Sequence, residues 1–201
     1  MQWEGMAADA SCLGGARGGG LGIGWVGRDP PAARATRPAM ILIGIGANLP
    51  GPHGEAPLVM ARAAVTALAG LAGLRLAAVS GFWESAPVPA SGQPRYVNAV
   101  ARLEGLAEPA ALLARLHAIE AAAGRRRTQA NAARPLDLDI LDIDGMVRAG
   151  PDPVLPHPRM ALRAFVLRPL AEVAPSWHHP LTGQAIGELL ATVAAQDAAR
   201  L

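Results

Sequence analysis

The segment that most constrains the fold is residues 136–140, where Leu136, Leu138 and Ile140 alternate with Asp137 and Asp139. Alternation with a period of two residues is typical of a strand that buries one face and exposes the other. Both carboxylates therefore leave the same face, about 7 Å apart at a rise of ~3.3 Å per residue. Because two like charges at this distance repel, we expect a cation between them.

Magnesium is the expected cation, because it takes hard oxygen ligands, commonly one or two carboxylates together with substrate phosphates. Arg134 and the run Arg125-Arg126-Arg127 lie just upstream of the acidic pair. Guanidinium groups suit phosphate oxygens, since they offer paired N–H donors in a planar fork. The stretch therefore predicts a site for a metal-bound polyphosphate. Taken singly, an Asp-x-Asp strand edge or an arginine run at a helix end is more often solvated surface.

The composition excludes several classes of protein. All 18 basic residues are arginine, so neither a P-loop NTPase of the usual kind nor Schiff-base chemistry with lysine is possible. A net charge of +2 is too small for a general nucleic-acid binder, and no apolar run approaches the ~20 residues that span a bilayer. The single cysteine, Cys12, suits a reducing compartment. We expect a cytoplasmic monomer that binds neither nucleic acid nor membranes.

Two regions follow from the distribution of residue types. Residues 1–39 are rich in Gly, Ala, Arg and Pro without sustained periodicity, which predicts a disordered N-terminal extension. Met40 stands directly before the first convincing strand, and we expect it to be the natural start of the protein. Residues 40–201 are then expected to form one domain.

The hydrophobic pattern after Met40 predicts alternating strands and helices. Strands are expected at 41–45, 74–83, 96–103 and from 137, helices at 55–70, 108–123 and 183–199, and irregular or short helical structure at 159–172. The order β-α-β-β-α-β predicts an α+β fold: a ferredoxin-like βαββαβ sheet with helices on one face, plus a C-terminal helix.

Several short motifs follow one another along residues 40–180. They are Ile43-Gly44-Ile45-Gly46-Ala47-Asn48-Leu49, Gln93-Pro94-Arg95-Tyr96-Val97-Asn98, Gly124-Arg125-Arg126-Arg127, Arg134-Pro135-Leu136-Asp137-Leu138-Asp139, Pro156-His157-Pro158-Arg159 and Arg163-Ala164-Phe165-Val166-Leu167. In this order and spacing they resemble the 6-hydroxymethyl-7,8-dihydropterin pyrophosphokinases of folate synthesis. The resemblance implies that the pterin hydroxymethyl oxygen attacks the β-phosphorus of ATP, which transfers pyrophosphate and releases AMP.

The resemblance also implies roles for individual residues. The catalytic set is Asp137, Asp139, Arg125 and Arg134, with Asp137 and Asp139 as ligands of two Mg²⁺ ions. The residues implied to bind ATP are Arg127, Arg134, His157, Arg163 and His117. Those implied to bind the pterin are Ser85, Val88, Tyr96, Asn98 and Phe165.

General chemistry is compatible with these roles. Phosphoryl-type transfer mainly needs positioning and neutralisation of charge, so no protein nucleophile is expected. A flat bicyclic ring suits aromatic faces such as Tyr96 and Phe165, and its amide-like edge suits Asn98, which offers both a carbonyl and an NH₂. Outside the motif, Tyr96 would more often be a core strand residue and His157 a histidine bonded to backbone in a proline-rich turn.

Two other function classes remain open from the residues alone. A metal-dependent nuclease or phosphodiesterase could use the acidic pair, but a groove for a nucleic-acid strand needs stacking aromatics along a basic track. A non-catalytic ferredoxin-like module that senses a small ligand would not need paired acids beside arginines. A dinucleotide-binding interpretation of Gly44-Ile45-Gly46 fails, because position 49 is Leu and no acid follows about 20 residues later.

Overall fold

The computed structural model of the protein describes residues 38–125 and 133–201. Its elements are β1 (Ala39–Ala47), α1 (Pro57–Ala69), β2 (Leu74–Val79), β3 (Trp83–Ser85), β4 (Tyr96–Gly105), α2 (Pro109–Ala122), β5 (Asp137–Ile143), a 3₁₀ turn η1 (Met160–Leu162), α3 (Ala164–Val173), α4 (Ile186–Thr192) and β6 (Ala199–Arg200). Of the extension expected to be disordered, residues 1–37 lie outside the described residues. Ala39, which the sequence analysis placed in that extension, is instead the first residue of β1. None of the helices in the described part is long and apolar enough to cross a bilayer.

The strands form one antiparallel sheet in the order β5-β1-β4-β3-β6, and β2 also pairs with β4. This confirms the predicted ferredoxin-like arrangement. The strand expected at 74–83 is instead divided into β2 and β3. Ser80 explains the division, because its Oγ takes the place of a backbone carbonyl and accepts the Val100 N–H at 2.9 Å. The chain bends there and returns to β4 as a second short strand.

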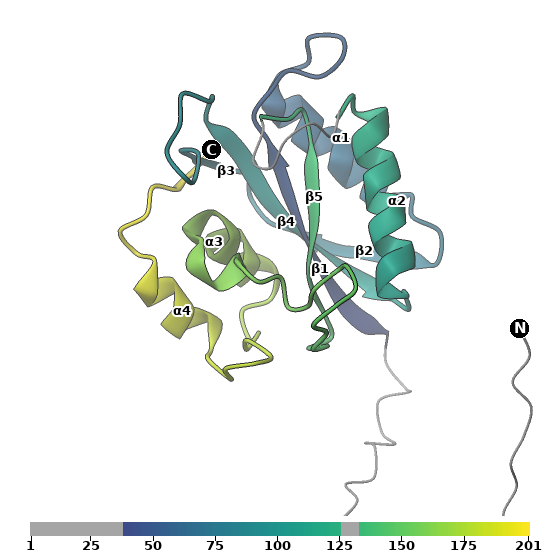
Figure 1. The fold of residues 1–201 in the computed structure, drawn as a ribbon, viewed down its shortest axis with the longest axis vertical. Helices are drawn as coiled ribbons and strands as arrows, with labels where there is room; N and C mark the ends of the chain where they lie inside the picture. The colour runs from purple at the N-terminus through teal and green to yellow at the C-terminus, as the bar shows by residue number, and fades with distance from the viewer. Residues whose placement is uncertain (1–37, 126–132) are drawn as a thin grey trace, which may run out of the picture. The chain divides into compact units, whose positions relative to one another are not determined.

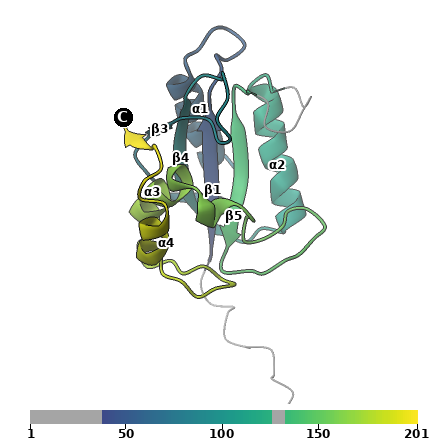
Figure 2. The same cartoon turned by 60° about the vertical axis from the view of Figure 1, so that its left-hand side comes forward.

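Helices cover both faces of this sheet, as Figures 1 and 2 show: α1 and α2 lie on one side, and α3 and α4 on the other. The sequence predicted helices on one face plus a C-terminal helix. The second layer arises because the segment expected to be irregular or short helical at 159–172 forms α3, whose buried residues pack on the other face together with α4. Ile41, Ile43 and Ile45 of β1 point into the core under α1 and α2, whereas Leu42 points into the core beside α3. Alternate side chains of a strand face opposite sides, so β1 is buried on both faces. The sheet is therefore the middle layer of the domain.

The layer formed by α3 and α4 leaves part of its face of the sheet uncovered. Beyond Leu42, the residues of β1 on this face are Gly44 and Gly46, which carry no side chain to pack against a helix. The start of α3 and the loop before it border this uncovered area from one side. A pocket therefore opens where the helical layer ends.

A buried carboxylate joins β5 to the chain that follows α3. Asp142 is fully buried, and its Oδ2 accepts the indole N–H of Trp177 at 3.0 Å. Its Oδ1 accepts the Gly145 N–H at 3.1 Å. Burial raises the pKa of Asp142, and the Trp177 hydrogen bond opposes this rise. The pair links the central sheet to the C-terminal part of the domain.

The C-terminal helix is shorter than the 183–199 expected from the sequence, since α4 ends at Thr192. After it, the carbonyl groups of Ala194, Gln196 and Ala198 accept hydrogen bonds from the guanidinium of Arg168. These side-chain bonds replace helical ones, so the chain leaves the helix and continues to β6.

Trp177→Phe keeps an aromatic ring but removes the only side-chain donor that the described residues offer to the buried Asp142 carboxylate. We expect a loss of about 1–3 kcal/mol in the free energy of unfolding, measured with urea, because a buried carboxylate loses its side-chain donor and keeps only backbone N–H groups such as that of Gly145. Trp83→Phe is the matched control, since its indole bonds Glu172 at the surface, at 3.0 Å. An equal or larger loss in the control would contradict this account.

Candidate active site

The uncovered part of the sheet forms a cavity of about 520 Å³, a size typical of small-molecule sites. Its walls come from β1, β4 and β5, the loop 86–93, the segment 152–159 and the start of α3. All the residues assigned to the site from sequence that the structure describes line this one cavity: Ser85, Val88, Tyr96, Asn98, His117, Arg125, Arg134, Asp137, Asp139, His157, Arg163 and Phe165. Arg127 lies outside the described residues.

The acidic pair stands on the face of β5 that borders the cavity. Asp137 and Asp139 are partly exposed, while Leu138 and Ile140 between and after them are buried, as the alternation predicts. On the neighbouring strand β1, Gly46 pairs with Asp137 and Gly44 with Asp139. Because glycine has no side chain, β1 places no side chain beside either carboxylate. The space at Gly46 stays open, whereas the Leu141 side chain lies against Gly44.

Two guanidinium groups hold Asp137. Its Oδ1 accepts a hydrogen bond from Arg125 Nη1 at 2.5 Å and from Arg134 Nη1 at 2.9 Å. Arg125 is itself positioned by Glu120 of α2, whose Oε1 also accepts the backbone N–H of Leu138 at 2.7 Å. The start of β5 and the first arginine are thus fixed by one buried carboxylate.

Asp139 lies in a different environment. Its side chain is 46% exposed to the cavity and lies 3.9 Å from Nε2 of His157, which is an ion-pair distance but too long for a hydrogen bond. Desolvation by the walls of the cavity, with repulsion from Asp137 and Glu120, raises the pKa of Asp139 to about 6. Arg163 and Arg134 oppose this rise. A cation near Asp139 would relieve the repulsion.

His157 is neutral at ordinary pH. Burial, then the positive charges of Arg163 and Arg159, lower its pKa to about 4. Its Nδ1 accepts the backbone N–H of Arg159 at 3.2 Å, so the proton of the neutral ring belongs on Nε2. The ring therefore presents an N–H donor on the side where Asp139 lies.

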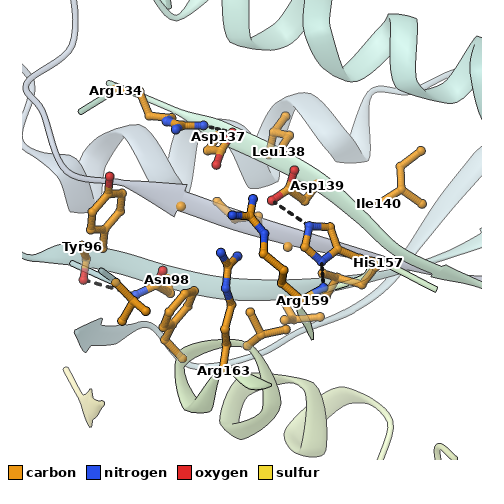
Figure 3. A pocket seen from close by; sticks show the side chains of 18 of the residues that line it. Tyr96, Asn98, Arg134, Asp137, Leu138, Asp139, Ile140, His157, Arg159 and Arg163 are labelled. Atoms are coloured by element: carbon orange, nitrogen blue, oxygen red, sulfur yellow. Dashed lines mark hydrogen bonds and ion pairs between the residues drawn. The ribbon is translucent and has the colours of Figure 1, made fainter. Parts of the chain in front are cut away.

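A second pair of arginines faces the acids from the opposite wall. Figure 3 shows Arg159 and Arg163 reaching from the segment before α3 toward Asp137 and Asp139. Neither guanidinium has an ion pair with a carboxylate within 38–125 and 133–201. Burial and the charge of Arg159 lower the pKa of Arg163. Two neighbouring cations that form no ion pair with a carboxylate of the described residues favour a ligand that carries several negative charges.

The other end of the cavity is less charged. The NH₂ of Asn98 donates to Ser85 Oγ at 3.0 Å and to the carbonyls of Tyr96 and Trp83 at 3.3 and 3.4 Å. Two carbonyl acceptors fix this orientation of the amide, so only its oxygen is available to a ligand. The sequence had suggested that both groups of the amide would be available, and the NH₂ is instead used to hold β3.

The side chain of Asn48 connects the charged end of the cavity with the less charged end. It is buried at the end of β1, and its Nδ2 donates to Gln93 Oε1 at 3.2 Å and to the Pro94 carbonyl at 3.3 Å. Its Oδ1 accepts the Arg134 N–H at 2.9 Å. Gln93 Oε1 also accepts the hydroxyl of Tyr96 at 3.0 Å. One side chain therefore connects the loop before β4 with the arginine that holds Asp137.

Sequence reasoning missed three of these residues: Glu120, Arg159 and Asn48. Glu120 could have been found, since it continues the buried series Leu112 and Leu116 at a spacing of four residues on α2, and a charge on a buried stripe needs a partner. For Arg159 and Asn48 the motif was visible but not the direction of the side chain.

The carboxylate arrangement fits magnesium. In the described parts of the chain, no three Asp, Glu, His or Cys side chains gather as a complete metal site. Magnesium does not need one, because it keeps several waters and is usually held by one or two carboxylates plus substrate phosphates. Asp137 and Asp139, beside two glycines, offer this set.

Comparison with known proteins gives a consistent result. The sequence model of the 7,8-dihydro-6-hydroxymethylpterin-pyrophosphokinase family matches residues 42–175. A 2-amino-4-hydroxy-6-hydroxymethyldihydropteridine pyrophosphokinase of Pseudomonas aeruginosa is 38% identical over 161 residues, which is 80% of this chain and 96% of that protein. The enzyme of the same name from Synechocystis sp. is 35% identical over 152 residues, or 76% and 75% of the two chains.

Solved structures resemble the fold at lower identity. A wild-type Plasmodium falciparum HPPK-DHPS chain superimposes with a TM-score of 0.60 at 10% identity, over 80% of this chain and 44% of that one. An HPPK-DHPS chain crystallised with substrates gives a TM-score of 0.55 at 12% identity, over 77% and 43%. This chain spans less than half the length of either of these solved chains. At such low sequence identity, the similarity shows a shared fold only.

Gly46→Val tests whether the space between the strands is a ligand site. A Cβ at position 46 would lie 3.7 Å from the Asp137 Cβ and 3.9 Å from Asn98 Oδ1, so Gly46→Ala fits and serves as the control. The two additional methyl groups of valine would fill the open space. We expect ATP with magnesium to bind at least about 10-fold more weakly by calorimetry, a cost typical of overpacking. Unchanged binding by a folded valine variant would contradict this prediction.

Proposed function

Because this chain belongs to the 7,8-dihydro-6-hydroxymethylpterin-pyrophosphokinase family, we propose that the cavity beside β5 is its active site. The enzyme transfers pyrophosphate from ATP to 6-hydroxymethyl-7,8-dihydropterin and releases AMP, a step of folate synthesis. The single observation that carries the assignment of the site is the acidic pair of β5 facing a cavity with arginines on both walls.

The charged end of the cavity is the proposed nucleotide half. Asp137 and Asp139 would hold two magnesium ions, which when bound neutralise the phosphates and withdraw charge from the attacked phosphorus. Arg125 and Arg134 lie beside Asp137, and Arg163 lies on the opposite wall. Their donors suit the non-bridging oxygens of a triphosphate, and Arg127 is proposed to join them.

Three further residues are proposed to bind the nucleotide. His157 is neutral and presents its Nε2–H into the cavity, so it can donate to a phosphate oxygen without adding a charge. Arg159 stands beside Arg163 and extends the cationic wall. His117 lines the cavity from α2.

The less charged end is the proposed pterin half. The free oxygen of Asn98 can accept a hydrogen bond from the amino-pyrimidine edge, and Ser85 holds the amide in place. Phe165 has the guanidinium of Arg163 5.4 Å from its ring centre, so one face of the ring is covered and the other can stack on a flat ligand. Tyr96 and Val88 complete this end.

The residues act mainly by positioning. No side chain in the cavity needs to form a covalent bond, because a bound hydroxymethyl group can attack the β-phosphorus directly. The fixed arginines stabilise the negative charge that spreads over the equatorial oxygens, and they do so without reorganising. Closure of the cavity around the reactants would exclude water from competing as an acceptor.

The proposal extends to the form of the enzyme. We propose a monomer as the working unit, since this chain by itself supplies the acidic pair, the arginines of both walls and the less charged end of the cavity. The need for cellular ATP and the lone Cys12 support a cytoplasmic location. The family match at residues 42–175 lies within 40–201, which we propose as the catalytic domain.

The nature of the products tests the function directly. The purified full chain is incubated with ATP, magnesium and 6-hydroxymethyl-7,8-dihydropterin, and the nucleotide products are separated. AMP and the pterin pyrophosphate should appear in equal amounts. Formation of ADP, or hydrolysis of a phosphodiester such as single-stranded DNA in place of this reaction, would favour a different enzyme class.

Asp137→Asn and Asp139→Asn each remove one negative charge at nearly constant volume. We expect kcat to fall at least about 100-fold in both, since charge stabilisation is the main contribution to this type of transfer. The midpoint of urea unfolding should change little in Asp139→Asn, because that side chain faces the cavity and has no close ion pair. It should fall in Asp137→Asn, which loses the ion pairs with Arg125 and Arg134, so kcat is measured under conditions where this variant is folded. Asp144→Asn, in the turn after β5, is the control and should keep full activity. Normal turnover in either first variant would refute the metal assignment.

Asn98→Ala should separate the two halves of the site. We expect pterin binding to weaken about 10-fold or more, as for loss of a hydrogen bond in a buried site, and ATP binding to change far less. Ser85→Ala removes the hydrogen bond that supports the amide but keeps its oxygen, so its effect should be smaller. Both are measured as dissociation constants by calorimetry. Equal weakening of both ligands in Asn98→Ala would count against the assigned pterin end.

A further inference from the structure

The end of the chain returns to the border of the cavity. After α4 the chain runs to β6, which pairs antiparallel with β3, and the Leu201 N–H donates to the Phe82 carbonyl at 2.9 Å. Figure 1 shows the C-terminus beside β3. This segment lies beyond residues 42–175, the part that matches the family. Two of its side chains contact the walls of the cavity from outside.

Asp197 forms hydrogen bonds with both ends of the loop that makes up one wall of the cavity. The residues 86–95, called here the pterin loop, connect β3 to β4 and line the cavity through Val88. At the start of the loop, the Ala86 N–H donates to Asp197 Oδ2 at 3.2 Å. At its end, Arg95 Nη1 donates to the same oxygen at 2.8 Å. Arg95 Nε also donates to Glu84 Oε2 at 2.8 Å.

Gln196 forms hydrogen bonds with a second wall of the cavity, the start of α3. Its Oε1 accepts the N–H of Ala164, the first residue of α3, at 2.9 Å, and its Nε2 donates to the Leu162 carbonyl at 2.9 Å. The N-cap residue Arg163 supplies no side-chain cap of its own, so Gln196 satisfies a helical N–H that would lack a partner. Ala164 lies between Arg163 and Phe165, and both of these line the cavity.

Hydrogen bonds from α3 hold the backbone of residues 194–198 in place. Arg168 of α3 donates to the carbonyls of Ala194 at 3.2 Å and Gln196 at 3.3 Å, and also to that of Ala198. Because the backbone on both sides of Asp197 is fixed to α3, the Asp197 carboxylate has a fixed place. The loop bonded to it is then fixed relative to α3 as well.

The contacts of Asp197 affect the conformation of the pterin loop more than the free energy of unfolding of the domain. The side chains of Asp197 and Arg95 are 52% and 43% exposed, and water screens ion pairs of this kind. The pairing is still specific: the hydrogen bond to Arg95 lowers the pKa of Asp197, and the bonds to Asp197 and Glu84 raise that of Arg95. The same carboxylate oxygen meets a backbone N–H and a guanidinium from opposite ends of a loop.

We propose that Gln196 and Asp197, the C-terminal brace, are positioning residues that set the pterin loop and the start of α3 for pterin binding. This inference rests on the proposed pterin end of the cavity. Without Asp197 the loop samples conformations that do not bind the pterin, and the apparent affinity falls with the fraction of competent loop. Without Gln196 the start of α3 loosens, which displaces both Phe165 and Arg163.

The test compares Asp197→Ala, Asp197→Asn and Gln196→Ala in the full-length chain. For Asp197→Ala we expect the pterin KM to rise about 5–10-fold, with the ATP KM changed less than about twofold, as a competent fraction of 10–20% would give. Asp197→Asn keeps an oxygen for the Ala86 N–H and should recover part of the loss. Gln196→Ala should raise both KM values, because it acts through Arg163 as well as Phe165.

Hydrogen exchange followed by mass spectrometry gives a second readout that does not depend on catalysis. Peptides covering residues 86–95 should exchange faster in Asp197→Ala than in the wild type, while the midpoint of urea unfolding stays the same. Glu104→Gln is the matched control: it removes the charge of Glu104 on β4, a partly exposed ion-pair partner of Arg75 and Arg102, and Glu104 does not line the cavity. It should leave both KM values and loop exchange unchanged.

The outcomes are distinguishable. Unchanged pterin KM together with unchanged loop exchange in Asp197→Ala would overturn the brace, as would an equal rise in both KM values accompanied by a lower unfolding midpoint. A wild-type protein that forms no AMP would refute the proposed function. In that case faster exchange of residues 86–95 in Asp197→Ala would still support the brace as the element that fixes this loop.

Discussion

The structure depends on placing two carboxylates side by side on one strand and balancing their charge. Asp137 is balanced within the protein by Arg125 and Arg134, at 2.5 and 2.9 Å. Asp139 is not balanced to the same degree, and its raised pKa reflects desolvation and the nearby negative charges. One acid is thus compensated by arginines and the other is not, and both are open on the same side; the proposed magnesium site rests on this difference.

The antiparallel sheet makes this arrangement possible. β1 lies between β5 and β4, and its two glycines leave the surface free where Asp137 and Asp139 on one side and Asn98 on the other need room. The same strand is closely packed elsewhere, with Ile41, Leu42 and Ile43 fully buried. A rigid central strand therefore carries both the core of the domain and the floor of the cavity, so the charged and the less charged ends keep a fixed separation.

Local sequence patterns correctly predicted those parts of the fold that depend on residues close together in the chain. The alternation around Asp137 gave the strand and the shared face of the two acids, and Glu108 with Pro109 marked the start of α2, where Glu108 accepts the N–H groups of Ala110 and Ala111. Features caused by distant contacts were missed. The break before β3 needs the hydroxyl of Ser80 to meet Val100, and the early end of α4 needs Arg168. The contact between Ala86 and Asp197 joins residues 111 positions apart, which no periodicity reports.

The most direct measurement of the central claim is anomalous diffraction from crystals grown with manganese and a non-hydrolysable ATP analogue. Manganese prefers the same oxygen ligands as magnesium and can be located by its scattering. We expect metal peaks about 2.0–2.3 Å from carboxylate oxygens of both Asp137 and Asp139, with the analogue's phosphates completing the coordination. Metal bound only elsewhere, or phosphates seated away from the arginines of the two walls, would contradict it.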